Sequence, residues 1–258
     1  MRSLYLDGGR RSLVLRDGPA LRVVSEGRAD GMYPFRLLAR VIVCGPVEWD
    51  AGALLACLDQ GIPVIFLTAD GHPRAYCLAA QPRRQPLNDR LEEFLGRPDW
   101  HALYENWRRA AERREILGVL KRMGVRAPDL RPDRVTTLLL DKAAAGAGEV
   151  ARAAIRYWAG LLAATVATKL FEAGAEAPLL IERRPGWNLP ADFARIGAWA
   201  HYLWLPEFVG GPPDACTEPG SAAFRRRLTE IFERHRQETD RRLSLLLNRF
   251  VYWLGGMR

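Results

Sequence analysis

Short apolar runs separated by turn residues dominate the first part of the chain. Pairs such as Asp-Gly and Gly-Pro stand between several of them. Runs of this length, bounded by turn residues, are typical of β-strands. The predicted strands are Leu4–Leu6, Ser12–Leu15, Leu21–Val24, Val41–Cys44 and Val64–Leu67. The pattern therefore predicts a β-rich region over residues 1 to about 80.

One helical segment interrupts these strands. Asp50 is suited to cap its start, and Gly61 is suited to end it. Between them, Leu54, Leu55 and Leu58 lie at helical spacing. We expect this helix and the strands on either side of it to form a small βαβ-like unit.

The composition changes after residue 80. Residues 81–90 contain two prolines and three arginines, which favours a linker. From Leu91 onward alanine, leucine, arginine and glutamate dominate at helical spacing. The predicted helices lie near 99–123, 132–143, 147–172, 189–205 and 221–254. We therefore expect an α+β fold: a small β-rich domain (1–80) with one or two short helices, then a larger all-α domain (91–258).

The charge of the chain points to a polyanionic partner. Lysine and arginine number 38 against 30 acidic residues, a formal net charge of +8, and only three of the basic residues are lysine. The planar guanidinium group of arginine matches phosphate oxygens well. Nucleic acid is therefore the favoured partner. The alternative is an arginine-rich composition whose charges are merely solvated.

Other function classes find little support. No apolar run reaches the length of a membrane span, so we expect no membrane partner. Asp7 interrupts the start before a signal-like apolar run develops, which favours a cytoplasmic location. The four cysteines form no Cys-x-x-Cys pair, so we expect reduced thiols rather than a zinc site.

Specific segments of the β-rich region are similar to a known family. The segments are Leu4–Gly8, Arg40–Gly45, Gln60–Leu67 and Asp70–Pro73. In the helical region, Gly148–Trp158 and Arg183-Arg184-Pro185 with Asn188 follow in the same order as in that family. Together they resemble Cas1, the integrase subunit of CRISPR adaptation, in which a β domain precedes a helical domain. The resemblance implies a role in spacer acquisition and thus in antiviral defence.

The resemblance also implies a metal site, of which one ligand is visible. Glu149 occupies the place of a metal-binding glutamate. Family members normally add a histidine from a Gly-x-x-His segment and a later carboxylate. Here the chain passes from Leu205 to Ser221 through a Gly/Pro-rich stretch without that segment. We therefore expect the site to be incomplete, although an active protein would use Mg²⁺ or Mn²⁺ as a metal-dependent DNA integrase or endonuclease.

Substitute ligands offer an alternative. His235, Glu238 and Asp240 form a cluster, and the first two, three residues apart, share a helix face and could hold one cation. The same residues read equally well as a solvated, charged helix face. Glu149 likewise fits a structural role at the positive end of a helix dipole. His201, among aromatic residues, is expected to be a packed core residue.

Two hypotheses follow from the resemblance. In the first, the protein joins a DNA 3′-hydroxyl to a phosphate of the repeat. In the second, it binds duplex DNA without catalysis, or serves as a structural subunit of a CRISPR complex. The family forms dimers through the β domain and assembles with Cas2, so a homodimer and Cas2 are implied partners. The predicted DNA-binding residues are Arg108, Arg109, Arg113, Lys142, Arg152, Arg156, Arg183 and Arg184.

Overall fold

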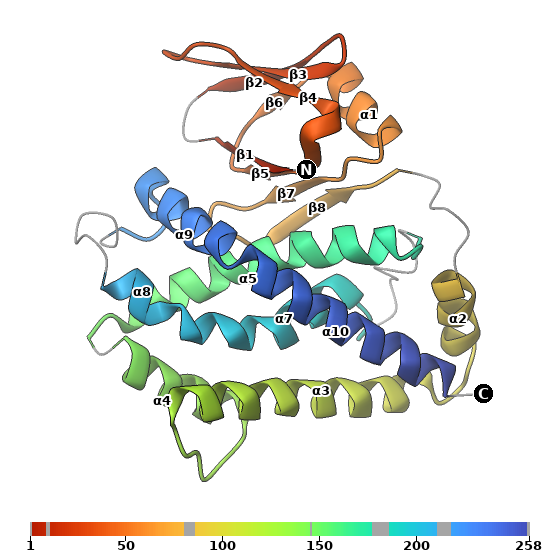
Figure 1. Ribbon diagram of the computed structural model, residues 1–258, viewed down its shortest axis with the longest axis vertical. Coiled ribbons are helices and arrows are strands. Elements are labelled where there is room, and N and C mark those ends of the chain that lie inside the picture. The colour runs from red at the N-terminus through yellow and green to blue at the C-terminus, as the bar shows by residue number, and fades with distance from the viewer. Residues whose placement is uncertain are drawn as a thin grey trace.

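The computed structural model describes residues 2–8, 11–79, 86–144, 146–176, 186–210 and 218–256. A β-rich part packs on one side of a larger helical part, as Figure 1 shows. The predicted order of a β domain followed by a mostly helical domain is therefore confirmed.

The first of two sheets lies against the helices. Its strands, in spatial order, are β1 (Arg2–Asp7), β5 (Leu38–Cys44), β7 (Val64–Leu67) and β8 (Pro73–Cys77). Strands β1 and β7 both run parallel to β5, whereas β8 runs antiparallel to β7. Six of the seven residues of β5 are buried, as expected for a strand in the middle of a sheet covered on both faces.

The second sheet forms the outer layer of the β domain. Its strand order is β4 (Gly31–Pro34), β3 (Ala20–Ser25), β2 (Ser12–Asp17) and β6 (Glu48–Trp49). The first three strands are antiparallel, and the short β6 pairs in parallel with β2. Val14 and Leu21 of this sheet share a core with Val41 and Val64 of the other. This core holds the two sheets face to face.

The predicted βαβ-like unit is confirmed. Helix α1 (Ala51–Asp59) begins where expected, because the Asp50 carboxylate accepts a hydrogen bond of 3.0 Å from the Ala53 amide. Gly61, just beyond the helix, has a φ of +68°, a conformation that glycine adopts readily. The chain then enters β7, which pairs in parallel with β5.

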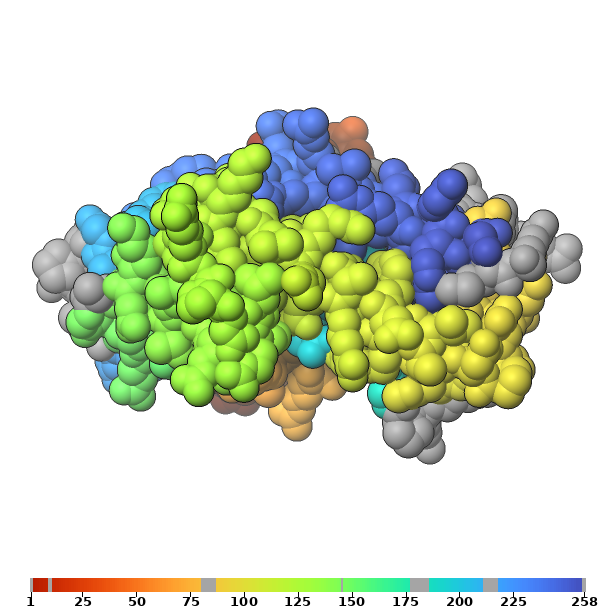
Figure 2. Space-filling model, turned by 90° about the horizontal axis from the view of Figure 1, so that it is seen from below, coloured from red at the N-terminus to blue at the C-terminus, as the bar shows by residue number. Residues whose placement is uncertain are grey.

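The helical part is built around one long central helix. Helix α5 (Gly148–Glu172) contacts strand β8 on one side and further helices on the others, and most of its residues are buried. The surrounding elements are α2 (Pro86–Leu95), α3 (Trp100–Met123), α4 (Pro132–Ala143), α7 (Leu189–Gly197), the 3₁₀ helix η2 (Ala198–Leu203), α8 (Leu205–Val209), α9 (Ala222–Arg234) and α10 (Arg236–Gly255). Figure 2 shows that α3, α4 and α10 form much of the face opposite the β domain. None of the described helices is both long enough and apolar enough to cross a bilayer.

Ion-pair and hydrogen-bond contacts connect the β domain to helix α9. The Arg225 guanidinium donates to both carboxylate oxygens of Asp7, at 3.1 Å through Nε and 2.6 Å through Nη2. The Tyr5 hydroxyl donates to Glu233 Oε1 at 2.5 Å. Both pairs connect strand β1 to α9, so the orientation of the first sheet is set by a helix near the other end of the chain.

The structure corrects several element boundaries. Residues 86–90, expected within a linker, belong to α2, whose Leu87, Leu91 and Phe94 are buried at helical spacing. The single helix expected over 189–205 is divided into α7, η2 and the start of α8, where Pro206 occupies the first turn. Strands β4, β6 and β8 were not predicted.

The predicted helix over 221–254 is interrupted at His235. This residue ends α9 and precedes α10. Its ring stacks on Trp204, with ring centroids 4.8 Å apart and planes within 8° of parallel. Its Nε2 lies 3.0 Å from Glu207 Oε2. The break thus coincides with a side chain held by two neighbours from the α8 region.

Candidate nucleic-acid interface

The start of helix α5 presents Glu149 to solvent. The residue lies in the first turn, as predicted, where its charge is favoured by the helix dipole. Within the described part of the chain, no three His, Cys, Asp or Glu side chains gather closely enough to hold a metal ion. A divalent cation of the Mg²⁺ type requires several oxygen ligands. The described residues therefore do not fit such an ion.

Basic residues continue from Glu149 along the same region. Arg152 and Arg156 are exposed and lie four residues apart, so they extend from one side of α5. Lys142 is exposed in the last turn of α4. Among the described residues, none of these three side chains forms an ion pair. Their charges are available to an anionic partner.

Arg156 lies beside the turn that connects β7 and β8. Within this turn the Thr68 hydroxyl donates to Asp70 Oδ1 at 2.5 Å, and His72 Nε2 lies 3.3 Å from Asp70 Oδ2. The Thr68 hydrogen bond lowers the pKa of the Asp70 carboxyl, and the neighbouring His72 and Arg156 lower it further. The turn therefore holds an ionised carboxylate beside Arg156.

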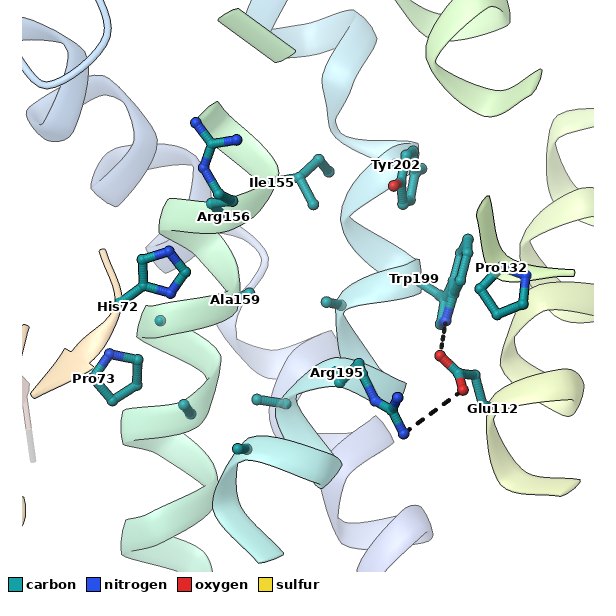
Figure 3. A pocket seen from close by; sticks show the side chains of 15 residues that line it. His72, Pro73, Glu112, Pro132, Ile155, Arg156, Ala159, Arg195, Trp199 and Tyr202 are labelled. Atoms are coloured by element: carbon teal, nitrogen blue, oxygen red, sulfur yellow. Dashed lines mark hydrogen bonds and ion pairs between the residues drawn. The ribbon is translucent and has the colours of Figure 1, made fainter. Parts of the chain in front are cut away.

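A hollow of about 440 Å³ lies next to Arg156 (Figure 3). Small residues from α5 and α7 form much of its lining, among them Ala159, Ala163 and Ala194. Arg195 stands at another part of the rim. Because its floor is apolar, the hollow offers charged groups to a ligand only around the edge.

The far wall of this hollow is held by Glu112 of α3. Its carboxylate accepts a hydrogen bond of 3.3 Å from the Trp199 indole, and it lies 3.8 Å from an Arg195 nitrogen (Figure 3). Trp199 also stacks on Tyr202, with ring centroids 5.5 Å apart. Glu112 is thus engaged in fixing the wall and is not a free carboxylate.

The arginine cluster predicted on α3 divides into two kinds of residue. Arg108 is held between Glu105 at 2.6 Å and Asp192 at 3.2 Å, and only 21% of its side chain is exposed. Arg109 is 76% exposed, with a distant contact of 3.7 Å to Glu105. Arg113 is also exposed. Arg108 therefore joins α3 to α7, while the other two remain open to solvent.

The second predicted pair, Arg183 and Arg184, lies outside the described residues. The asparagine of the same sequence motif is described and behaves as expected. Asn188 caps α7, because its side-chain oxygen accepts a hydrogen bond of 3.0 Å from the Ala191 amide.

The three residues considered as substitute metal ligands have separate partners in the structure. His235 contacts Glu207, as described above. Glu238 instead binds Arg122 at 2.9 Å and Arg242 at 3.0 Å. Asp240 lies 3.4 Å from Lys169 and 3.9 Å from Arg236. The helix break at His235 and these separate cationic partners keep the three side chains from meeting.

His201 is a core residue, as predicted. It is 1% exposed and contacts the rings of Trp158, Trp204 and Phe232. Burial lowers the pKa of its imidazole to about 3, and the nearby His235 contributes to the lowering. The ring is therefore neutral at physiological pH and is enclosed by apolar groups.

Comparisons with known proteins agree with this architecture. Residues 4–94 match the family model described as CRISPR associated protein Cas1. A Cas1 protein from Thermotoga maritima has a similar structure, with a TM-score of 0.77 and 14% sequence identity, over 99% of this chain and 97% of that chain. Residues 4–94 therefore resemble the Cas1 family in sequence, and the whole chain shares the fold of a Cas1 protein.

The sequence match to a curated relative is confined to a short segment. The CRISPR-associated endonuclease Cas1 1 of Thermodesulfovibrio yellowstonii is 32% identical over 69 residues, which are 26% of this chain and 21% of that protein. The alignment thus spans about a fifth of the relative's length.

Two further solved structures also share the fold. A casposase bound to an integration product has a TM-score of 0.65 and 15% identity, over 91% of this chain and 82% of that chain. A Cas1–DNA complex has a TM-score of 0.61 and 14% identity, over 96% of this chain and 91% of that chain. At these identities the similarity establishes the fold.

Sequence reasoning missed several polar residues around α5 and the domain boundary. The contact between Asp70 and His72 lies in a short segment without strand or helix periodicity, so the sequence does not predict it. Arg195 was not singled out, because it lies in an apolar helical pattern without another arginine beside it. Asp7 binds Arg225, which lies 218 positions away, so no local pattern predicts this pair.

Proposed function

We propose that this protein is a DNA-binding Cas1-type subunit of CRISPR adaptation that holds duplex DNA for spacer integration without a complete metal site. The proposal rests on three exposed basic side chains without ion pairs near Glu149, in a chain with a Cas1 fold. These residues are Lys142, Arg152 and Arg156. Guanidinium groups in such a position suit phosphate oxygens, which supply most of the affinity of sequence-independent DNA binding.

Additional basic side chains extend the proposed interface. Arg109 and Arg113 of α3 are exposed and join it in the proposal, together with Arg183 and Arg184. Arg108 is not part of the proposed interface, because its guanidinium is already bound by Glu105 and Asp192.

A second candidate function is catalysis with unusual ligands, as a Mg²⁺- or Mn²⁺-dependent integrase or endonuclease. The structure gives this candidate little support, because His235, Glu238 and Asp240 are engaged with separate partners. Glu149 would then supply a single carboxylate, and one carboxylate holds such an ion weakly.

The proposal includes two protein partners. The β domain exposes Met32, Leu37 and Leu55, whose side chains are about half exposed, and exposed apolar groups of this size suit a protein contact. We propose a homodimer formed through this domain. A structure of similar fold belongs to a Cas6-RT-Cas1–Cas2 complex, with a TM-score of 0.62 over 96% of this chain and 35% of that chain, and we propose Cas2 as a further partner.

DNA binding is tested by fluorescence anisotropy with a labelled duplex. We expect binding that persists in EDTA, is unchanged by Glu149→Ala, and is weakened by the double substitution Arg152→Ala/Arg156→Ala. Arg16→Ala serves as the matched control, since Arg16 is exposed on β2, in the outer sheet of the β domain, and belongs to none of the elements of the proposed interface. Absence of duplex binding at low salt would overturn the proposal.

Catalysis is tested separately by incubating the protein with a 3′-hydroxyl oligonucleotide and repeat DNA in Mn²⁺ or Mg²⁺. We expect no joined product. Product that requires both the metal and Glu149 would show that the protein is an integrase and that its remaining ligands were not recognised.

A further inference from the structure

A second cavity, of about 600 Å³, lies where the β domain meets helix α9. Its walls come from β1, β2, β3 and β5, from Tyr157 of α5 and from the side of α9 that faces them. Cavities of this size at a boundary between domains are common sites for small molecules. Lys142, Arg152 and Arg156 do not line it, although Tyr157, which follows Arg156 in α5, does.

The carboxylates that line this cavity are already neutralised. Asp7 is bound by Arg225 through two hydrogen bonds. Glu233 accepts a hydrogen bond from the Tyr5 hydroxyl and lies 3.5 Å from Arg236. The third carboxylate, that of Glu230, lies 3.9 Å from Arg227. Each acidic group therefore has a cationic partner, and the cavity does not present unbalanced negative charge.

Two of its arginines have no such partner. Arg28 follows β3, and Arg226 projects from α9; both are exposed. Within the described residues neither forms an ion pair. Arg225, by contrast, is 9% exposed and donates to Asp7 and to the Gly220 carbonyl. The cavity thus has two available guanidinium groups, one from each domain.

The remaining lining suits the body of a polar ligand. The hydroxyls of Ser12 and Ser25 lie 2.9 Å apart and hydrogen-bond to each other at the β2–β3 side. The Thr229 hydroxyl belongs to the α9 side. Hydroxyl groups can donate or accept, so they match the hydroxyls of a sugar.

We propose that this cavity binds a small phosphate monoester, such as a sugar phosphate or mononucleotide, with its phosphate between Arg28 and Arg226. Guanidinium groups bind phosphate oxygens through paired, charge-assisted hydrogen bonds. The phosphate would bridge the β domain and α9 and strengthen the connection that Asp7 and Arg225 already make. This inference stands independently of DNA binding.

Isothermal titration calorimetry on the full chain tests the proposal with ribose 5-phosphate, AMP and inorganic phosphate as probes. We expect saturable binding of at least one ester, weakened about tenfold by Arg28→Gln or Arg226→Gln and abolished by the double substitution. Arg74→Gln and Arg241→Gln, exposed arginines that do not line the cavity, are matched controls and should bind as the wild type does. Arg152→Ala/Arg156→Ala should also leave ester binding unchanged.

Three outcomes overturn the proposal. The first is that none of the probes binds. The second is that ribose binds as well as ribose 5-phosphate, or that the double substitution of Arg28 and Arg226 leaves ester binding intact. The third is that none of the esters binds, while Arg28→Gln and Arg226→Gln each weaken the binding of a DNA duplex. That result would assign the two guanidinium groups to a DNA phosphate instead.

Discussion

Gly160 of α5 lies so close to Gly71 that a Cβ atom at position 160 would stand 1.5 Å from the Gly71 carbonyl oxygen. Gly71 has a φ of +89°, and a Cβ there would lie 2.5 Å from the Cα of Tyr157. Two backbones are therefore in direct contact where the β7–β8 turn meets the central helix. This contact requires glycine on both sides.

Replacing Gly160 by alanine should disrupt this contact. The clash is with backbone rather than with a flexible side chain, so the turn or the helix must shift. We expect the free energy of unfolding to fall by at least about 3 kcal/mol, at the upper end of the cost of overpacking. Chemical denaturation followed by circular dichroism measures the change.

A matched control is available on α3. Gly118 is also a helical glycine, but a Cβ there would meet no atom within 4 Å. Gly118→Ala should therefore stabilise the protein by roughly 0.5–1 kcal/mol through helix propensity. Equal effects of the two substitutions would contradict the close contact between the domains.

The pair formed by Asp7 and Arg225 should contribute measurably to stability. The side chain of Arg225 is 10% exposed and that of Asp7 is 38% exposed, so solvent screens the pair only partly. Asp7→Asn leaves a nearly buried guanidinium without its counter-charge, and we expect a loss of about 2 kcal/mol. A double-mutant cycle with Arg225→Gln should give a coupling free energy of about 1–3 kcal/mol. Additive effects would show that the pair does not couple the domains.

His201 should make stability depend on acid pH. Its pKa is lowered to about 3 in the folded protein, against about 6.5 in an unfolded chain. Between these values the unfolded state binds a proton that the folded state does not, so stability falls as pH falls from 6.5 towards 3. From this residue alone we expect a loss of about 2 kcal/mol between pH 7 and pH 5.

His201→Phe isolates this contribution. The variant keeps an aromatic ring at the site and removes the titrating group, so its free energy of unfolding should decline less between pH 7 and pH 5 than that of the wild type. Urea denaturation at the two pH values measures both slopes. Parallel declines in the two proteins would show that His201 is accessible to protons in the folded state.

The proposed DNA interface predicts a specific dependence on salt. Each phosphate contact that is removed should reduce the slope of log affinity against log salt concentration by about 0.9 for duplex DNA. Arg152→Ala/Arg156→Ala should therefore weaken binding at low salt and reduce the slope by nearly two, without regard to DNA sequence. Anisotropy titrations over a range of salt concentrations measure this slope.

Arg108→Ala provides the contrasting case. Because Arg108 is held by Glu105 and Asp192, its loss should lower stability and leave the salt slope unchanged. A reduced slope in Arg108→Ala, or an unchanged slope in the double variant of Arg152 and Arg156, would mean that DNA binds along a different face.

Local pattern was enough to predict most of the fold. The α1 cap at Asp50, the parallel pairing of the strands around α1, and helices α3, α4 and α5 follow from spacing and capping residues close in sequence. The short strand β6 has only two residues, too few to show the alternation of apolar and polar positions that predicts a strand. No glycine or proline near His235 signals the break between α9 and α10. The side chains that hold His235, those of Glu207 and Trp204, are distant in sequence, so a local pattern cannot predict the break.

The candidate sites were less accessible to sequence reasoning. Exposed arginines can be counted, but whether one is free depends on partners elsewhere in the chain. Arg108 and Arg156 look alike in sequence, and only the fold brings Asp192 to the first. The neutralised walls of the second cavity likewise depend on Tyr5 and Glu233, which are 228 positions apart.

The link between Asp7 and Arg225 has a consequence for the order in which the protein matures. These residues are separated by 218 positions, so the first strand leaves the ribosome long before its partner is translated. Domains generally fold during synthesis in their order of emergence. The β domain can therefore form early, but it acquires its final attachment only after the penultimate helix has emerged. A ribosome stalled before Arg225 would carry a folded β domain still unattached to α9.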